Sequence, residues 1–324
     1  MSIKLMEHIN ISILDGEDTS TRDSTFYLEV LGCVPDYRSQ KTLHVNMGLN
    51  QFHLPIRAKA QRINGEIGLF FPNLKQLLER LERWQNKLQL KCTDSPFSYQ
   101  HIIPALNTEA NVATNAWEFS HAKILYEHVI ILGPNGNKFV CFESPCDYRD
   151  ISEMLGKHPG GKAFGDGIPY IKIFIKPNTA SGISRFYQDY MHASALLFEI
   201  KNEDGTHCGD NNKLKKRLNG CQILCGDLQR LVFIETTNFI APYDGHHICI
   251  YIDGFEEFFH RLDKDGLIYN PQSSNQSRQS WTEVQNAEQF RFLRVIDPLT
   301  HEHLLDLEHE VRSQQHPASP LLLN

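Results

Sequence analysis

Four short segments of the chain repeat one pattern. Residues 8–14, 66–72, 170–176 and 247–253 each place an aliphatic side chain at every second position. This period of two is the spacing of side chains along one face of a β-strand. A helical pattern follows each segment, so one supersecondary unit recurs four times. Such a repeat constrains the architecture of a chain more strongly than its composition does.

The other face of each segment opens with a side chain that can bind a metal ion or a proton. These residues are His8, Glu66, Tyr170 and His247. Taken alone, a histidine at the start of a strand is most often solvated or hydrogen-bonded. The recurrence of such residue types at equivalent positions makes them candidates for a functional site.

The expected helices lie between the repeated strands and later hairpins. Apolar residues at helical spacing predict helices within 21–31, 74–88, 183–190 and 255–262, the second with Asn73 as its N-cap. The expected hairpin strands are 41–47 with 49–54, 127–132 with 137–143, 221–225 with 229–235, and 290–296 with 303–311. A single small sheet with one helix leaves an apolar face open, so the four units are expected to pair.

The composition is that of a globular protein long enough for two domains. The chain has 324 residues, of which 41% are hydrophobic and 22% charged. A net charge of -7 argues against nucleic acid as a partner, because phosphate binding needs a basic face. No apolar run is long enough for a membrane span. The eight cysteines form no CxxC pair, so we expect reduced thiols in a cytoplasmic protein.

The order of these elements resembles the vicinal oxygen chelate superfamily. The resemblance rests on the four strand starts and on the hairpin ends 48–54 and 133–139, and it covers nearly the whole chain. The superfamily includes glyoxalase I, type I extradiol dioxygenases and bleomycin or fosfomycin resistance proteins. The resemblance implies an α+β fold in which four βαβββ modules pair into two half-open barrel domains. We expect these domains at 1–146 and 167–312, with a linker at 147–166 and a flexible tail at 313–324.

The resemblance also implies where metal ligands lie. In this superfamily they come from the start of the first strand and the middle of the last strand of each module. The matching residues are, in the N-terminal module pair, His8, His53 and Glu66, and, in the C-terminal pair, Glu235, His247 and Glu308. Glu308 is preferred to Asp306 and Glu310, which face the same way. Val140 stands where the family has a glutamate.

The same resemblance implies the cofactor and the catalytic residues. Two imidazoles and a carboxylate suit a divalent ion, here Fe, Mn, Ni or Zn. Tyr170 and Glu66 are the expected catalytic residues, and Tyr170 is expected to donate a proton to a bound oxyanion. Cys249 shares a face with His247, as a small buried side chain or as a soft ligand.

Three classes of function follow. The first is a metal-dependent lyase, isomerase or dioxygenase that acts on a small oxygen-rich substrate. The second is a non-catalytic protein that binds a small molecule without metal, which the residues at Val140 and Tyr170 favour. The third is an interaction protein in which one module pair braces the other. A monomer or a homodimer is expected in each case.

Overall fold

The computed structural model describes residues 2–14, 22–39, 41–89, 97–103, 126–145, 162–200, 218–269 and 279–322. The chain divides into two compact units. We call His8–Ile171 the N-terminal unit, and Met1–Glu7 with Lys172–Asn324 the C-terminal unit. The division falls within strands β1 (Ile3–Asn10) and β11 (Tyr170–Ile175).

The N-terminal unit contains two modules. The first has the end of β1 followed by β2 (Ile13–Leu14), the π-helix η1 (Phe26–Val30), β3 (Val34–Pro35), β4 (Leu43–Met47), β5 (Asn50–Leu54) and β6 (Ile56–Arg57). The second has β7 (Gly65–Phe71), α2 (Leu74–Gln89), β8 (Ser98–Ile102), β9 (His128–Leu132) and β10 (Lys138–Glu143). The strand orders are β1–β5–β4–β3 and β7–β10–β9–β8.

The C-terminal unit repeats this plan. Its first module runs through β11, α4 (Ala180–Met191), β12 (Ala195–Glu199), β13 (Asn219–Cys225) and β14 (Gln229–Glu235). The second contains β15 (His247–Ile252), α5 (Phe255–Lys264), β16 (Ile268–Tyr269), α6 (Trp281–Ala287), β17 (Gln289–Ile296), β18 (His303–Ser313) and the 3₁₀-helix η3 (Pro320–Leu322). The strand orders are β12–β13–β14–β11 and β16–β17–β18–β15.

The predicted repeat is confirmed. The last strand of a module pairs in parallel with its first strand, as β5 does with β1, β10 with β7 and β18 with β15. The hairpin partner of each last strand is antiparallel to it. The α+β class therefore follows from the sequence pattern. The strand expected at 8–14 differs at both ends: β1 begins at Ile3, where buried Ile3 and Leu5 extend the alternation upstream, and it ends at Asn10, with Ile13–Leu14 as the separate strand β2.

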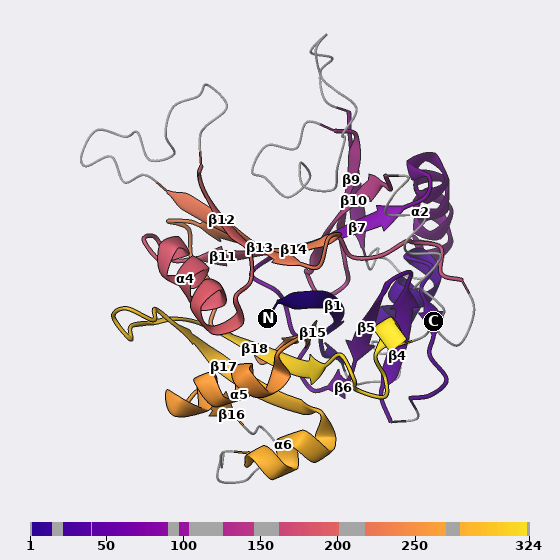
Figure 1. Ribbon diagram of the computed structural model, residues 1–324. Coiled ribbons are helices and arrows are strands. Elements are labelled where there is room, and N and C mark those ends of the chain that lie inside the picture. Colours follow the sequence, from indigo (N-terminus) through magenta and orange to yellow (C-terminus); the bar gives the residue numbers. More distant parts are fainter. Residues whose placement is uncertain are drawn as a thin grey trace, which may run out of the picture. The chain divides into compact units, whose positions relative to one another are not determined.

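Helices α2, α4, α5 and α6 pack against strands, and α4 also contacts β17 and α5 of the neighbouring module. Helix α4 lies against β12 and β13 (Figure 1) and buries Ile183, Phe186 and Tyr187. Helix α2 begins as expected, because the Oδ1 of Asn73 accepts a hydrogen bond from the Gln76 N–H at 2.9 Å. The expected domain limits stay a prediction, and residues 147–161 of the expected linker lie outside the described part of the chain.

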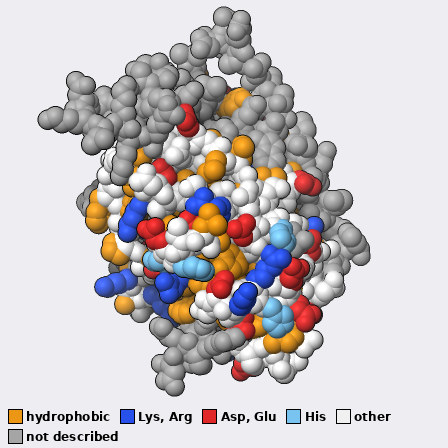
Figure 2. All heavy atoms as spheres, turned by 60° about the vertical axis from the view of Figure 1, so that its left-hand side comes forward, with side chains coloured by type: hydrophobic (Ala, Val, Ile, Leu, Met, Phe, Trp, Pro, Cys, Tyr) orange, Lys and Arg blue, Asp and Glu red, His pale blue; other side chains and the backbone are white. Residues whose placement is uncertain are grey.

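The surface carries both signs of charge. Figure 2 shows one face, on which the described acidic and basic side chains are interspersed. Within the described ranges, no helix has the length and apolar character that crossing a membrane requires. The described cysteines are all buried and unbridged: Cys33, Cys141, Cys221, Cys225 and Cys249.

Candidate functional site

The C-terminal unit gathers buried charged side chains on one face of β15, β17 and β18. His247 lies opposite Glu308 in the β15–β18 register, and Arg291 of β17 lies opposite Glu310 of β18. The alternate residues of β18, which include the fully buried His309, face the other way; the His309 Nε2 contacts the hydroxyl of Tyr187 on α4 at 2.7 Å. Strand alternation thus separates an apolar, helix-covered face from a charged one.

His247 lies between two carboxylates. Its Nδ1 is 3.8 Å from the Oε1 of Glu308, and its Nε2 is 3.5 Å from the Oε2 of Glu310. All three residues are less than one-tenth exposed. Each ring nitrogen therefore has its own acidic neighbour in a site with little access to water.

Two arginines neutralise the carboxylates. Arg291 donates to Glu308 Oε1 through Nη1 and to Glu310 Oε2 through Nη2. Arg312 contacts Glu310 Oε1 at 2.6 Å and Glu7 Oε2 at 2.9 Å, and it also donates to the Tyr251 hydroxyl. Burial alone would lower the pKa of Arg291, but Glu310 and Glu308 raise it above its ordinary value. The guanidinium groups and carboxylates therefore form one ionised network.

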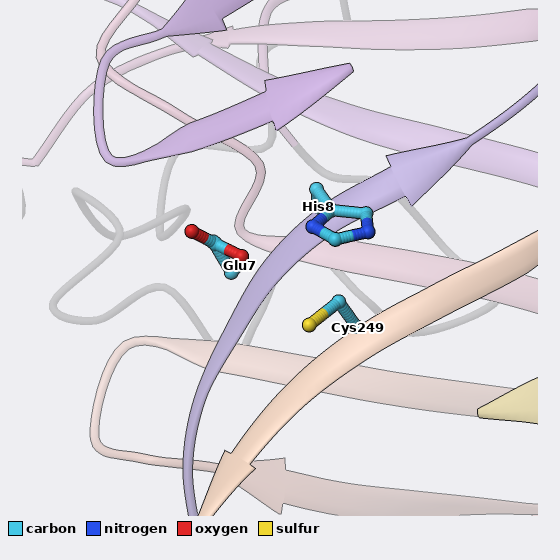
Figure 3. A group of neighbouring side chains, drawn as sticks. All are labelled: Glu7, His8 and Cys249. Atoms are coloured by element: carbon cyan, nitrogen blue, oxygen red, sulfur yellow. The ribbon is translucent and has the colours of Figure 1, made fainter. Parts of the chain in front are cut away.

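Glu7, which pairs with Arg312, lies near Cys249 (Figure 3), with the thiol sulfur and a carboxylate oxygen within 4.8 Å of each other. Burial raises the pKa of the Cys249 thiol well above its usual value. A protonated thiol is a poor ligand, and the role of Cys249 as a small buried side chain or as a soft ligand stays a prediction. His8, also labelled in Figure 3, follows Glu7 on β1 and begins the N-terminal unit.

The donor set of His247 and Glu310 fits a divalent ion. Two ligands bound to one ion at about 2.1 Å have donor atoms roughly 3 to 3.5 Å apart, which is the separation of His247 Nε2 and Glu310 Oε2. Glu308, on the Nδ1 side, is placed where a carboxylate orients a ligating imidazole. The geometry therefore favours Glu310 as a ligand in place of Glu308, which was preferred from the sequence.

In the N-terminal unit, three imidazoles form a stack. The ring centroids of His8 and His53 are 3.6 Å apart at 22°, and those of His53 and His44 are 3.5 Å apart at 3°. His44 was not anticipated; it is the cross-strand partner of His53 in the β4–β5 hairpin. Each nitrogen lone pair lies in the plane of its ring, and one ion cannot lie in several stacked, nearly parallel planes, so this arrangement does not converge on one ion.

Hydrogen bonds from neighbouring side chains hold His53 in this stack. The Nε2 of His53 donates to the Oε1 of Gln51 at 3.0 Å, and the Gln51 amide donates to Asp36 at 2.8 Å. Burial raises the pKa of Asp36, but hydrogen bonds from Arg38 and Gln51 outweigh it and lower the pKa to about 2. An ionised Asp36 therefore fixes the Gln51 amide, and with it the tautomer of His53.

Glu66 does not join His8 and His53. Its Oε1 accepts from the Tyr170 hydroxyl at 3.0 Å, and its Oε2 is 2.9 Å from the Lys138 Nζ. Glu66 comes from β7, which pairs with β10, whereas the histidines come from β1 and β5. Where the structure describes the chain, no group of three possible ligands within 4.8 Å includes Glu66 or His53. The expected N-terminal triad is therefore not assembled.

Tyr170 and Lys138 complete this second cluster. Tyr170 is fully buried, and burial followed by the charge of Glu66 raises its pKa well above the usual value. The Tyr170 hydroxyl donates its proton to a hydrogen bond with Glu66. Its expected role as a proton donor to a substrate stays a prediction. Lys138 was missed in the sequence; it opens β10, two residues before Val140, which is buried.

Glu235 was expected to be a metal ligand, but its carboxylate binds backbone N–H groups. Its Oε1 accepts from the N–H of Ala180 and its Oε2 from the N–H of Asn219, both at 3.0 Å. Ala180 begins α4, so the carboxylate stabilises the helix start. Glu235 belongs to none of the possible ligand groups in the described part of the chain, and neither does Glu308.

Comparison with known proteins shows which solved structures share this fold. No protein-family model matches the sequence, and no curated protein sequence is significantly similar to it. Solved structures do match. A glyoxalase I variant from Zea mays has a TM-score of 0.51 and 9% identity, over 95% of this chain and 93% of that chain. A "putative dioxygenase" from Bacillus subtilis subsp. subtilis str. 168 has a TM-score of 0.53 and 11% identity, over 100% of this chain and 88% of that chain.

The chain has the fold of the vicinal oxygen chelate superfamily. The resemblance noted in the sequence is thereby confirmed for the architecture. Sequence identity this low shows that the fold is shared, but it does not show which reaction the chain catalyses. The chemistry has to be argued from the residues of this chain.

Proposed function

We propose that the protein is a divalent-metal-dependent enzyme that acts on a small oxygen-rich substrate, with His247 and Glu310 among the metal ligands. The observation that carries the proposal is the separation of 3.5 Å between His247 Nε2 and Glu310 Oε2, with Glu308 on the opposite ring nitrogen. A bound Fe, Mn, Ni or Zn ion would act there as a Lewis acid toward substrate oxygens.

The surrounding residues would hold this pair in position. Glu308 faces Nδ1 of His247 and favours the tautomer that leaves Nε2 as the donor atom. Arg312 contacts the other oxygen of Glu310 at 2.6 Å, and Glu7 in turn holds Arg312 at 2.9 Å. Burial excludes water and strengthens every electrostatic interaction in the site.

The structural neighbours support this class of function. The Zea mays protein is a glyoxalase I, and the Bacillus subtilis protein carries the name of a dioxygenase. Lyase or isomerase chemistry and dioxygenase chemistry each use an ion that holds two neighbouring oxygens of a small molecule. Both reaction types are compatible with a site of one imidazole and one carboxylate that leaves coordination positions open.

The proposal is tested by metal content. The purified full-length protein is loaded separately with Fe(II), Mn(II), Ni(II) and Zn(II), dialysed, and analysed for bound metal. We expect a stoichiometric ion in the wild type and its loss in His247→Ala and Glu310→Gln. The exposed residues His303 and Glu256 provide controls, and His303→Ala and Glu256→Gln should retain the ion. Unchanged metal in both site variants would contradict the proposal.

One observation favours a second candidate, a metal-free protein that binds a small molecule. The guanidinium of Arg291 bridges Glu308 and Glu310 and supplies a positive charge to both. If the folded wild type retains none of the four metals, this second candidate replaces the first.

A further inference from the structure

One carboxylate oxygen of Glu310 contacts two different side chains. The Oε2 of Glu310 accepts from Nη2 of Arg291 and also faces Nε2 of His247 at 3.5 Å. The other oxygen, Oε1, lies 2.6 Å from Arg312. If Oε2 serves as a metal ligand, its hydrogen bond to Arg291 is weakened, because the two cations repel each other at close range.

Arg291 has a second anchor that this competition leaves intact. Its Nη1 donates to Glu308 Oε1, which lies on the Nδ1 side of His247. The arginine would therefore stay beside the site with a weakened hydrogen bond on one edge of its guanidinium. A buried guanidinium with a poor acceptor is costly, so this edge gains most from a new anionic partner.

The exposure of the side chains indicates where that partner comes from. The Arg291 side chain is 18% exposed, compared with 9% for Glu308 and 4% for Glu310. Arg291 is thus the member of this trio that a molecule entering from solvent can reach. The planar fork of a guanidinium binds a carboxylate through two parallel hydrogen bonds.

We propose that Arg291 recognises a carboxylate group of the substrate, so that the substrate class is a small carboxylic acid with oxygen functions next to the acid. This inference rests on the proposed metal site at His247 and Glu310. The substrate carboxylate replaces the carboxylate oxygen of Glu310 as acceptor, one negative charge for another. A phosphate dianion would bring two charges close to Glu308 and Glu310 and is disfavoured by their repulsion.

The test measures binding by calorimetry to full-length protein loaded with Mn(II). The probes are pyruvate, its uncharged analogue hydroxyacetone, and inorganic phosphate. We expect pyruvate to bind the loaded wild type at least about tenfold more tightly than hydroxyacetone or phosphate, and to bind the metal-free protein about tenfold more weakly.

Variants of β17 separate the role of Arg291 from a structural one. Arg291→Lys keeps the charge but loses the fork, and it should weaken pyruvate binding about tenfold while retaining Mn(II). Arg291→Met should bind Mn(II) at least as tightly as the wild type, because the competing cation is gone. The exposed Arg294, on the same strand, provides the matched control, and Arg294→Met should change neither quantity.

The outcomes distinguish this inference from the proposal on which it rests. Absence of Mn(II) from the wild type overturns the metal site, and the inference with it. If the metal-loaded Arg291→Lys variant binds pyruvate as tightly as the wild type, the inference is overturned but the metal site is not. Equal affinity for pyruvate and hydroxyacetone, or preference for phosphate, overturns the carboxylate assignment. Circular dichroism confirms that each variant is folded.

Discussion

The role of a buried glutamate in this protein depends on its partners. Glu235 and Glu310 are both almost fully buried and both lie on the last strand of a module. Glu235 accepts two backbone N–H groups at the start of α4 and on β13, whereas Glu310 meets two guanidinium groups and an imidazole. The first arrangement stabilises a helix start, and the second is the one that we propose binds a metal ion.

We expect Glu235→Gln to lower the free energy of unfolding by about 1–3 kcal/mol, because one amide N–H loses its acceptor. Urea denaturation measures this loss, and Glu256→Gln on the exposed side of α5 is the control. Metal content should match that of the wild type. Loss of metal at unchanged stability would instead make Glu235 a ligand, as the sequence had suggested.

At the scale of elements, a glycine in β7 allows β7 and the start of β11 to pack closely. A Cβ atom at Gly68 would lie 2.4 Å from a ring carbon of Tyr170. Glu66 is two residues earlier on the same face of β7 and receives the Tyr170 hydroxyl. The ring therefore lies over the bare backbone at Gly68, and this position brings the hydroxyl to Glu66.

Gly68→Ala should destabilise the protein by about 1–3 kcal/mol, because the added methyl group overlaps the ring. Chemical denaturation of a double-mutant cycle checks the cause. In a Tyr170→Ala background, the same glycine substitution should cost far less, since the overlapping ring is absent. Equal costs in both backgrounds would show that the strain has another source.

Across the whole molecule, four copies of one module carry different chemistry at the same strand position. His8 lies in an imidazole stack, Glu66 and Tyr170 bond to each other beside Lys138, and His247 faces Glu308 and Glu310. We propose the metal site in the C-terminal unit because His247 Nε2 and Glu310 Oε2 lie 3.5 Å apart there.

Metal binding should raise the stability of the whole protein. An ion at about 100 times its dissociation constant adds about 2.7 kcal/mol, which corresponds to a rise in Tm of roughly 5–10 °C for a unit of this size. Differential scanning calorimetry with Mn(II), and again after chelation with EDTA, measures the shift. His247→Ala should show almost none of it. A shift of the same size in that variant would locate the stabilising ion elsewhere.

The sequence alone determined the repeated strands, most of the hairpins and helices, and their faces, but it missed β8, β12, β16 and α6. Side chains alternate with a period of two in strands and 3.6 in helices, and both periods are visible in neighbouring residues. That local signal predicted the four repeated strands, the hairpins and the Asn73 cap. It also placed His53, His247, Glu308 and Glu310 on polar faces.

Only the tertiary structure decided which of these side chains meet. The choice of Glu310 over Glu308 depends on the register of β18 against β15 and on the contacts of Arg291 from β17. The pairing of Glu66 with Lys138, 72 positions apart by number, depends on β7 lying beside β10. Strand alternation repeats every two residues, so it assigns a side chain to a face but leaves its position along the neighbouring strand undetermined. That position is set by long-range pairing and packing.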